Sequence, residues 1–309
     1  MSFRLRNRGD FKRMKMNKSF TYYLALLVIR LKGIKGLFSE DPVDYLALRK
    51  DDVLHPTKKL IKSCRISQFT LSQTRVTELQ GKGPSNKLLL FLHGGAFISG
   101  PARHHWDSIE KISKYTDYTI WLCDYPKAPE HTILSINENI DLVYKAALEN
   151  FKQDNIVVMG DSAGGTLAIT LVQRSILSNQ RLPSKIILIS PVMDASLENP
   201  EIERVDKIDP MLSKKGVLSA KKMCSGGLDL KCKELSPLYG GFNGFPSTYL
   251  FLAENDITYP DQLLFCRKLR NQGVENHLNI GRGMPHIWPL LPVMKEAGEA
   301  FKDILRILD

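Results

Sequence analysis

The stretch Gly160-Asp161-Ser162-Ala163-Gly164 decides the fold, because a strand pattern precedes it and a helix pattern follows it. Residues 156–159 form a short apolar run, and residues 165–177 carry apolar side chains at helical spacing. A serine between glycines at a strand-to-helix turn is typical of a nucleophile elbow, in which small neighbours permit the sharp backbone that exposes the hydroxyl. The stretch therefore predicts that Ser162 is a nucleophile at the end of a strand.

Short apolar runs recur along the rest of the chain and alternate with helical patterns. The expected strands are a hairpin at 61–68 and 72–79, and then 88–92, 119–123, 156–159, 186–189, 248–252 and a weaker 277–280. The expected helices between and after them are 135–150, 164–179, 260–271 and 292–307. Continuous apolar strands that alternate with helices predict an α/β fold, with a mostly parallel sheet covered on both faces.

Two segments depart from this rhythm. Leu24, Leu27, Val28 and Leu31 have i, i+3, i+4, i+7 spacing, which predicts an amphipathic helix over 20–32 whose apolar stripe packs on the core. A second helix is expected to begin with Asp41 as N-cap and Pro42 at its first position. A long charged stretch also interrupts the alternation after Pro191. We expect one structural domain, with a catalytic core at 59–192 and 236–309 and a helical cap at 1–58 and 193–235.

The net charge of +10 over 309 residues is concentrated near the start of the chain. Residues 1–18 hold seven Lys and Arg side chains and only one acid, Asp10. No helix-turn-helix, zinc-finger or RNA-binding signature accompanies them, so a nucleic-acid partner is not expected. Two interpretations stay open for this basic arm: a solvated leader, or a weak contact with acidic surfaces or anionic lipid.

Cysteines and apolar runs bear on the compartment. The five cysteines are scattered and form no Cys-x-x-Cys motif, so neither a zinc site nor a dithiol is indicated. Tyr22 to Ile29 is an uncharged run of eight residues closed by Arg30, well short of the ~20 that span a bilayer. We therefore expect a cytoplasmic protein.

A serine nucleophile needs oxyanion donors, a base and an acid that orients the base. The strand ending at Leu92 is followed by His93-Gly94-Gly95-Ala96, where glycines let backbone N–H groups approach a developing oxyanion. The oxyanion hole is expected to use N–H groups of Gly94, Gly95 or Ala96, completed by the N–H of Ala163.

Three acids follow the strand 248–252, and seven histidines compete for the base. Asp256 is favoured over Glu254 because it lies within the loop, whereas Asp261 falls where a helix begins. His286 is favoured because it follows the last strand. The order Ser162, Asp256, His286 is typical of α/β hydrolases and not of chymotrypsin or subtilisin.

Other side chains near these loops have weaker indications. His104 and His105 follow the oxyanion turn, where surface positions are favoured and a pocket position stays open. The candidate walls of an acyl pocket flank the catalytic loops and are Phe97, Ile98, Ile287 and Trp288.

Four segments together resemble the hormone-sensitive-lipase-like esterase branch of the α/β-hydrolase fold. They are His93-Gly94-Gly95-Ala96, Tyr125-Pro126-Lys127-Ala128-Pro129-Glu130-His131, Gly160 to Gly165, and Ser190-Pro191-Val192-Met193-Asp194. The resemblance covers the chain from about residue 85 to its end. It implies a carboxylesterase whose acyl pocket lies under a cap made of an N-terminal segment and an inserted segment.

The chain departs from that branch at three places. Pro126 and Lys127 replace the Arg-Leu of a typical Tyr-Arg-Leu-Ala-Pro-Glu-His segment. Ala96 stands where many members have a third glycine but keeps its backbone N–H. Glu254 replaces a glycine often found two residues before the acid, which weakens the assignment of Asp256.

The sequence therefore predicts a carboxylesterase for small to medium acyl esters, acting through a Ser-His-Asp triad and an acyl-enzyme, with no metal or organic cofactor. Three alternatives remain: an amidase or peptidase on the same triad, a catalytically inactive ligand-binding protein of this fold, and a membrane-tethered lipase that uses the basic arm. The oligomeric state is not indicated.

Overall fold

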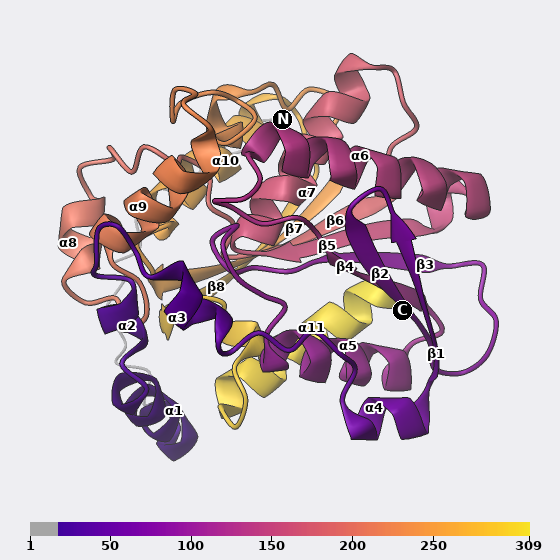
Figure 1. Cartoon of the computed structure of the whole chain (residues 1–309), viewed down its shortest axis with the longest axis horizontal. Helices are drawn as coiled ribbons and strands as arrows, with labels where there is room; N and C mark the ends of the chain where they lie inside the picture. Colours follow the sequence, from indigo (N-terminus) through magenta and orange to yellow (C-terminus); the bar gives the residue numbers. More distant parts are fainter. Residues whose placement is uncertain (1–17) are drawn as a thin grey trace, which may run out of the picture.

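The computed structural model describes residues 18–309, and an eight-stranded sheet forms its centre (Figure 1). The strands are β1 (Arg65–Leu71), β2 (Thr74–Gln80), β3 (Leu88–Leu92), β4 (Thr119–Asp124), β5 (Ile156–Asp161), β6 (Lys185–Ile189), β7 (Ser247–Asn255) and β8 (Asn276–Pro285). They lie in the order β1-β2-β4-β3-β5-β6-β7-β8. Only the pairs β1·β2 and β2·β4 are antiparallel, which confirms the predicted mostly parallel sheet.

Helices cover both faces of this sheet. The helices of the α/β layers are α4 (Lys58–Ser63), α5 (Arg103–Tyr115), α6 (Ile133–Asn150), α7 (Ala163–Leu177), α10 (Tyr259–Asn271) and α11 (Lys295–Leu308). Figure 1 shows α6, α7 and α10 on one side of the sheet and α5 and α11 on the other. Short 3₁₀ turns lie at Gln153–Asn155, Pro237–Tyr239 and Trp288–Leu290.

The side chains of the central strands alternate between two cores. Leu88, Leu90 and Leu92 of β3 pack with α6, α7 and α10, whereas Leu89 and Phe91 pack with α5 and α11. All five are fully buried, so the strand reads as an unbroken apolar run. This two-sided burial holds the carboxyl ends of β3, β5, β7 and β8 at one edge, where their loops meet.

A third group of helices lies together at one end of the sheet in Figure 1. These are α1 (Phe20–Leu31), α2 (Ile34–Leu37), α3 (Tyr45–Arg49), α8 (Ile202–Asp206) and α9 (Lys214–Ser225). The two chain segments touch directly: the Val43 N–H donates to Ser219 Oγ at 3.0 Å, and Lys35 donates to the Asp209 carbonyl at 2.9 Å. The N-terminal and inserted segments are therefore neighbours. Their role as a cap stays a prediction.

The start of the helix that was expected to begin with Asp41 as N-cap was predicted wrongly. The helix α3 begins at Tyr45, and its N-cap is Asp44, whose carboxylate accepts from the Ala47 N–H at 2.9 Å. Asp41 and Pro42 precede it in a turn. Asp44 accepts a hydrogen bond from an otherwise unpaired amide of the first turn. The Asp41-Pro42 pair is compatible with a helix start but caps no helix amide in the structure.

The apolar stripe of α1 follows the prediction only in part: Leu24 and Val28 line the cavity that contains Ser162, whereas Leu27 and Leu31 do not. Leu24, Leu27, Val28 and Leu31 are between 39% and 78% exposed, whereas the buried residues of the helix are Tyr22 and Ile29. The helix is apolar on nearly every side, so the spacing of its apolar residues does not decide which face is buried. The opposite face is the one that packs on the core.

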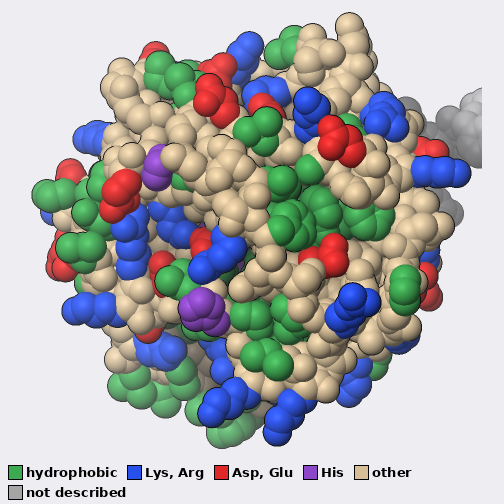
Figure 2. All heavy atoms as spheres, turned by 45° about the vertical axis from the view of Figure 1, so that its right-hand side comes forward, with side chains coloured by type: hydrophobic (Ala, Val, Ile, Leu, Met, Phe, Trp, Pro, Cys, Tyr) green, Lys and Arg blue, Asp and Glu red, His purple; other side chains and the backbone are tan. Residues whose placement is uncertain are grey.

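Three observations bear on the expectations for the membrane, the cysteines and the basic arm. No helix in the described part of the chain is long and apolar enough to cross a membrane. All five cysteines are free thiols. The basic run of residues 1–17 lies outside the described residues. On the face drawn in Figure 2, hydrophobic side chains gather in groups among Lys and Arg side chains.

Candidate active site

Ser162 lies at the sharp turn between β5 and α7. Its φ of 50° and ψ of −118° place a non-glycine residue in a strained backbone conformation. Its N–H donates to the Ile189 carbonyl of β6 at 2.9 Å, which holds the turn against the sheet. A Cβ at Gly160 would collide with the Gly164 carbonyl, and one at Gly164 with the Leu92 carbonyl. The glycines permit this close packing of β5, α7 and β3.

The turn after β3 carries the expected oxyanion donors. Gly95 has a φ of 121°, Ala96 of 56° and Phe97 of 68°, so three consecutive residues are in the left-handed region. This explains why glycine suits position 96, since a Cβ there costs about 1 kcal/mol. The Gly95 carbonyl accepts from the N–H groups of Ile98 and Ser99, both at 3.0 Å, and closes the turn.

Asp161, which the sequence did not single out, fixes this turn. Its Oδ1 accepts from the Gly94 N–H at 3.0 Å, and a Cβ at Gly94 would collide with the carboxylate. The Gly94 N–H is therefore occupied. Of the expected oxyanion donors, this leaves the N–H groups of Gly95, Ala96 and Ala163 as candidates. Ala163 is the first residue of α7, and the first amides of a helix have no intrahelical partner.

His105 holds the Asp161 carboxylate from the other side. Its Nδ1 accepts from the Ala102 N–H at 2.8 Å, so Nε2 carries the proton and points to Asp161 Oδ1 at 3.2 Å. Burial raises the pKa of Asp161, but His105 and the Gly94 N–H stabilise the carboxylate and the net shift is downward. His105 is buried on α5 and is not a surface residue as the sequence favoured.

His104, Asp161 and His105 also place three potential metal ligands within 4.8 Å of one another. His105 Nε2 also lies 3.4 Å from Asp161 Oδ2, so hydrogen bonds account for both oxygens of Asp161 and both nitrogens of His105. A metal ion would have to displace the proton that His105 shares with Asp161. The donor set therefore fits a hydrogen-bonded support of the oxyanion turn better than a metal site.

Asp256 and His286 meet at the ends of β7 and β8. Asp256 Oδ2 lies 2.7 Å from His286 Nδ1, and its Oδ1 accepts from the N–H and hydroxyl of Thr258 at 2.8 and 2.7 Å. A proton on Nδ1 leaves Nε2 of His286 as a base. Burial lowers the pKa of His286, but the carboxylates of Asp256, Asp209 and Asp161, with Asp256 foremost, together outweigh it, and the net pKa lies above its ordinary value.

A second buried carboxylate, Asp209, supports this loop from the inserted segment. Its Oδ2 accepts from the Ile257 N–H at 2.9 Å, and its Oδ1 from the N–H groups of Met211 and Leu212 at 2.8 and 2.9 Å. Burial and the charge of Asp256 raise the pKa of Asp209 to about 7. Asp209 lies 47 residues from Asp256 in the chain, so no sequence pattern indicates their proximity.

The other acids after β7 point elsewhere. Glu254 is exposed, and its Oε2 accepts from the Gly283 N–H at 2.8 Å. Asp261 on α10 accepts from the Asn199 amide at 2.7 Å. Of the three, the structure brings only Asp256 to His286.

Residues of the N-terminal segment anchor the loop that follows the oxyanion turn. Arg49 donates from Nε to the Ile98 carbonyl at 2.8 Å and from Nη2 to the Ala128 carbonyl at 2.9 Å, and it binds both oxygens of Glu130. Asp52 accepts from the Gly100 N–H at 2.6 Å. Neither Arg49 nor Asp52 was identified from the sequence.

His93, the first residue of the turn, is a structural residue. Its ring stacks on Tyr125 with centroids 4.3 Å apart, and the Tyr125 hydroxyl donates to the His93 carbonyl at 2.6 Å. Burial lowers the pKa of His93 to about 3, so the ring is neutral. The Tyr125–His131 segment thus fastens the oxyanion turn to β4.

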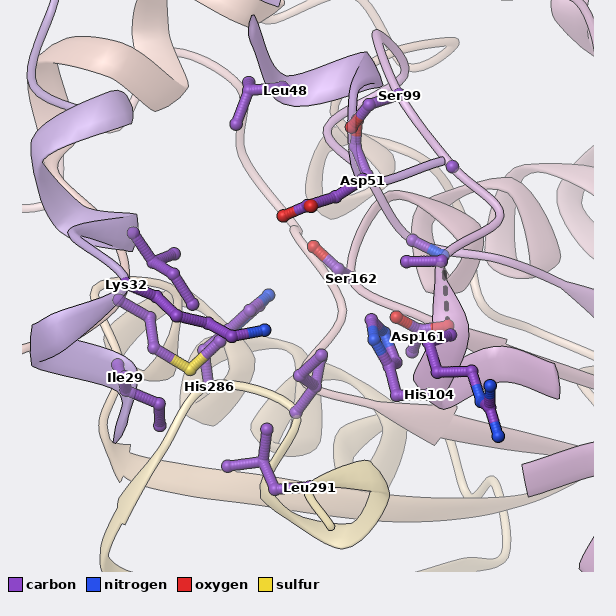
Figure 3. A pocket seen from close by; sticks show the side chains of 18 of the residues that line it. Ile29, Lys32, Leu48, Asp51, Ser99, His104, Asp161, Ser162, His286 and Leu291 are labelled. Atoms are coloured by element: carbon purple, nitrogen blue, oxygen red, sulfur yellow. Dashed lines mark hydrogen bonds between the residues drawn. The ribbon is translucent and has the colours of Figure 1, made fainter. Parts of the chain in front are cut away.

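Ser162 and His286 open into one cavity of about 700 Å³. Figure 3 shows them between two walls, with Ile29 and Lys32 on one side and His104 and Asp161 on the other. The wall contributed by the helices at the end of the sheet is mostly apolar and includes Leu24, Val28, Ile34, Leu37, Phe38, Met211, Leu212 and Val217. Of the four residues predicted to line it, Ile287 does so; Phe97, Ile98 and Trp288 are buried in the core.

Lys221 of α9 is an unusual part of this wall. It is fully buried, its amine has no hydrogen-bond partner among residues 18–309, and the amine lies 4.1 Å from the centroid of the Phe97 ring. Burial lowers the pKa of Lys221 to about 7. A charged amine is costly in such surroundings.

Comparisons with known proteins agree with this geometry. A family described as having the alpha/beta hydrolase fold matches residues 89–290. An esterase from Acinetobacter venetianus is 28% identical over 243 residues, which are 78% of this chain and 80% of that protein. A carboxylesterase/phospholipase, LipF, from Mycobacterium tuberculosis is 24% identical over 76% of this chain and 65% of its own length.

Solved structures agree as well. A Staphylococcus aureus protein described as a candidate esterase is 28% identical, with a TM-score of 0.79 over 95% of this chain and 94% of that one. An esterase from the bacterial hormone-sensitive lipase family has a TM-score of 0.82 over 95% and 98% of the two chains; at 21% identity it supports the fold alone. The chain belongs to the α/β-hydrolase fold family, as the sequence predicted, and it is similar to curated proteins named as esterases and lipases.

Proposed function

We propose that the protein is a serine carboxylesterase that hydrolyses small to medium acyl esters through Ser162, His286 and Asp256. The observation that carries the proposal is the 2.7 Å hydrogen bond between His286 and Asp256, in a cavity that the Ser162 elbow also lines. Esterase and lipase names among the relatives support the same class of reaction.

In the first half-reaction, His286 Nε2 takes the hydroxyl proton of Ser162 while the serine oxygen bonds to the ester carbonyl carbon. The carbonyl electron pair moves onto its oxygen, which binds the N–H groups of Gly95, Ala96 and Ala163. This oxyanion then collapses and breaks the bond to the alcohol oxygen. His286 gives that oxygen its proton, so the alcohol leaves and an acyl-serine remains.

In the second half-reaction, water takes the place of the alcohol. His286 accepts a proton from the water while the water oxygen bonds to the acyl carbon. The proton then passes to the Ser162 oxygen as the bond to the acyl carbon breaks and the carboxylic acid leaves. Asp256 holds the imidazole tautomer and stabilises its charged form in both halves. The support that Asp161 and His105 give to the oxyanion turn needs no movement during the reaction.

A fluorophosphonate tests the proposal, because it reacts with an activated serine. We expect a single label on the Ser162 peptide, and Ser162→Ala abolishes it and lowers ester hydrolysis by about 10⁴-fold or more. Ser99→Ala is the control, since Ser99 belongs to the same cavity wall and keeps the label. A label on another serine, or undiminished hydrolysis by Ser162→Ala, would refute the assignment.

The main alternative, amide or peptide hydrolysis on the same residues, differs in the leaving group. A panel of matched esters and anilides with the same acyl groups distinguishes them. We expect turnover of the esters and little of the anilides, and a preference for anilides would replace the esterase proposal.

A further inference from the structure

The outer face of α1 is an exposed apolar surface with no partner among the described residues. Phe20 is 81% exposed, Tyr23 60%, Leu27 51% and Leu31 78%. The sequence of the helix contains no acidic residue, and its only charge is Arg30. Contiguous exposed apolar surfaces are uncommon on soluble proteins, and where they occur they often mark interaction sites.

This face borders the mouth of the catalytic cavity. Leu24, Ala25, Val28 and Ile29 of the same helix line the cavity, as does Val293, which is 70% exposed. The inner side of α1 is anchored, because the Tyr22 hydroxyl donates to the Gly283 carbonyl at 2.8 Å. A molecule bound to the outer face would therefore lie at the entrance to Ser162.

Positive charge surrounds the same helix. Lys18 precedes it, Arg30 and Lys32 end it, and the sequence before Lys18 holds six Lys and Arg residues and one Asp. Glu296, the acid that meets the start of the helix, is bound by the N–H and hydroxyl of Ser19, both at 2.8 Å. An apolar helix face with Lys18, Arg30 and Lys32 at the ends of its helix combines the two signals that stable attachment to anionic lipid requires.

We propose that α1, with Lys18, Arg30 and Lys32 at its ends, docks the protein on an anionic lipid bilayer, with the cavity mouth toward the lipid. Phe20, Tyr23, Leu27 and Leu31 enter the acyl boundary, and the Lys and Arg side chains contact the headgroups. Apolar esters then reach Ser162 from the bilayer without crossing water. This delivery rests on the proposed esterase function, whereas the docking does not.

A second copy of the chain is the other occupant considered. Two-fold pairing of α1 with itself would bring two basic runs together, and like charges on one interface are unfavourable. Anionic headgroups complement the charge of this face. The charge therefore favours a lipid surface over self-association.

Vesicle flotation of the full chain tests the docking. The probes are vesicles of phosphatidylcholine alone and of phosphatidylcholine mixed with phosphatidylglycerol, each at low and high salt. We expect binding to the anionic vesicles that weakens at high salt. The double variant Leu27→Glu/Leu31→Glu lowers the vesicle-bound fraction about tenfold or more. Neither leucine lines the cavity, so hydrolysis of a water-soluble acetate ester is unchanged.

The matched control is Leu134→Glu/Leu142→Glu, two leucines of α6 that are 45% and 47% exposed. It keeps vesicle binding. Three outcomes overturn the docking: no binding of the wild type to anionic vesicles, equal loss in the control, or a concentration-dependent dimer that Leu27→Glu/Leu31→Glu abolishes. Vesicle binding by a protein without ester hydrolysis would reject the proposed function and leave the docking intact.

Discussion

At the scale of single residues, His286 is subject to two opposing effects. Burial disfavours its charged form, and the Asp256 carboxylate at 2.7 Å, together with the charges of Asp209 and Asp161, favours it, so that on balance its pKa is raised. A raised pKa makes Nε2 a stronger base. It also means that a larger share of the imidazole is protonated, and unable to accept the serine proton, at a given acidic pH.

This predicts that activity falls as the pH drops through a value above 6.5, the ordinary pKa of histidine. The acid limb of kcat/KM for a soluble acetate ester measures it. Asp256→Asn moves the limb to lower pH and lowers kcat by about 10⁴-fold. Glu254→Gln, the corresponding carboxylate-to-amide change two residues earlier, alters neither the acid limb nor kcat. An unchanged limb in Asp256→Asn, or equal losses in both variants, would contradict the assigned pair.

At the scale of elements, α3 holds the oxyanion loop through one side chain. Arg49 joins the Ile98 and Ala128 carbonyls and Glu130, so a helix near the N-terminus braces two loops of the core. The planar guanidinium makes these bonds together, and a lysine ammonium cannot reproduce their geometry. Arg49 does not line the cavity, so we expect it to position the backbone of the proposed oxyanion donors and not to contact substrate.

Arg49→Lys is therefore expected to lower kcat and kcat/KM by about tenfold each while leaving KM nearly unchanged, because the loss falls on the transition state. Steady-state kinetics on a soluble ester measures it. The control is Arg174→Lys, which alters another bidentate contact, with Asp141 between α7 and α6. A rise in KM alone, or the same loss in Arg174→Lys, would argue against a positioning role.

The elements also show what the sequence could predict. The strands β3, β5 and β6 are continuous apolar runs because both faces are buried, and their positions were predicted to within two residues. Helix α5 was missed although its buried Trp106, Ile109 and Ile112 have helical spacing, because its other buried residues are polar and obscure the apolar pattern. The exposed face of α1 was misassigned because both faces are apolar. Asp209 carried no local signal, since its function depends on contacts formed only by folding.

At the scale of the molecule, buried ionisable groups shape the pH dependence of stability. His93 and His104 have pKa values of about 3, so below pH 6.5 the unfolded chain binds protons that the folded chain does not. Burial raises the pKa of three carboxyl groups, that of Asp52 to about 6, that of Asp209 to about 7 and that of Asp261 to about 6. In the acidic range these groups bind more protons in the folded chain than in the unfolded chain, so their effect on stability is opposite to that of the two histidines. Lys221 differs from both groups because its contribution to the pH dependence of stability falls above pH 7.

The folded pKa of Lys221 is about 7, whereas an unfolded lysine titrates near 10.4. Below pH 7 the folded protein carries the full cost of a buried charge. Between these values the unfolded chain binds more protons, so stability rises with pH. Lys221→Met, which keeps the shape, is therefore expected to raise the Tm by about 2 °C or more at pH 6.5, with a smaller gain at pH 10. Thermal unfolding of wild type and variant at both pH values measures the difference. The exposed neighbour Lys222→Met leaves the Tm nearly unchanged. A gain that is independent of pH would show that packing, and not the buried charge, sets the effect.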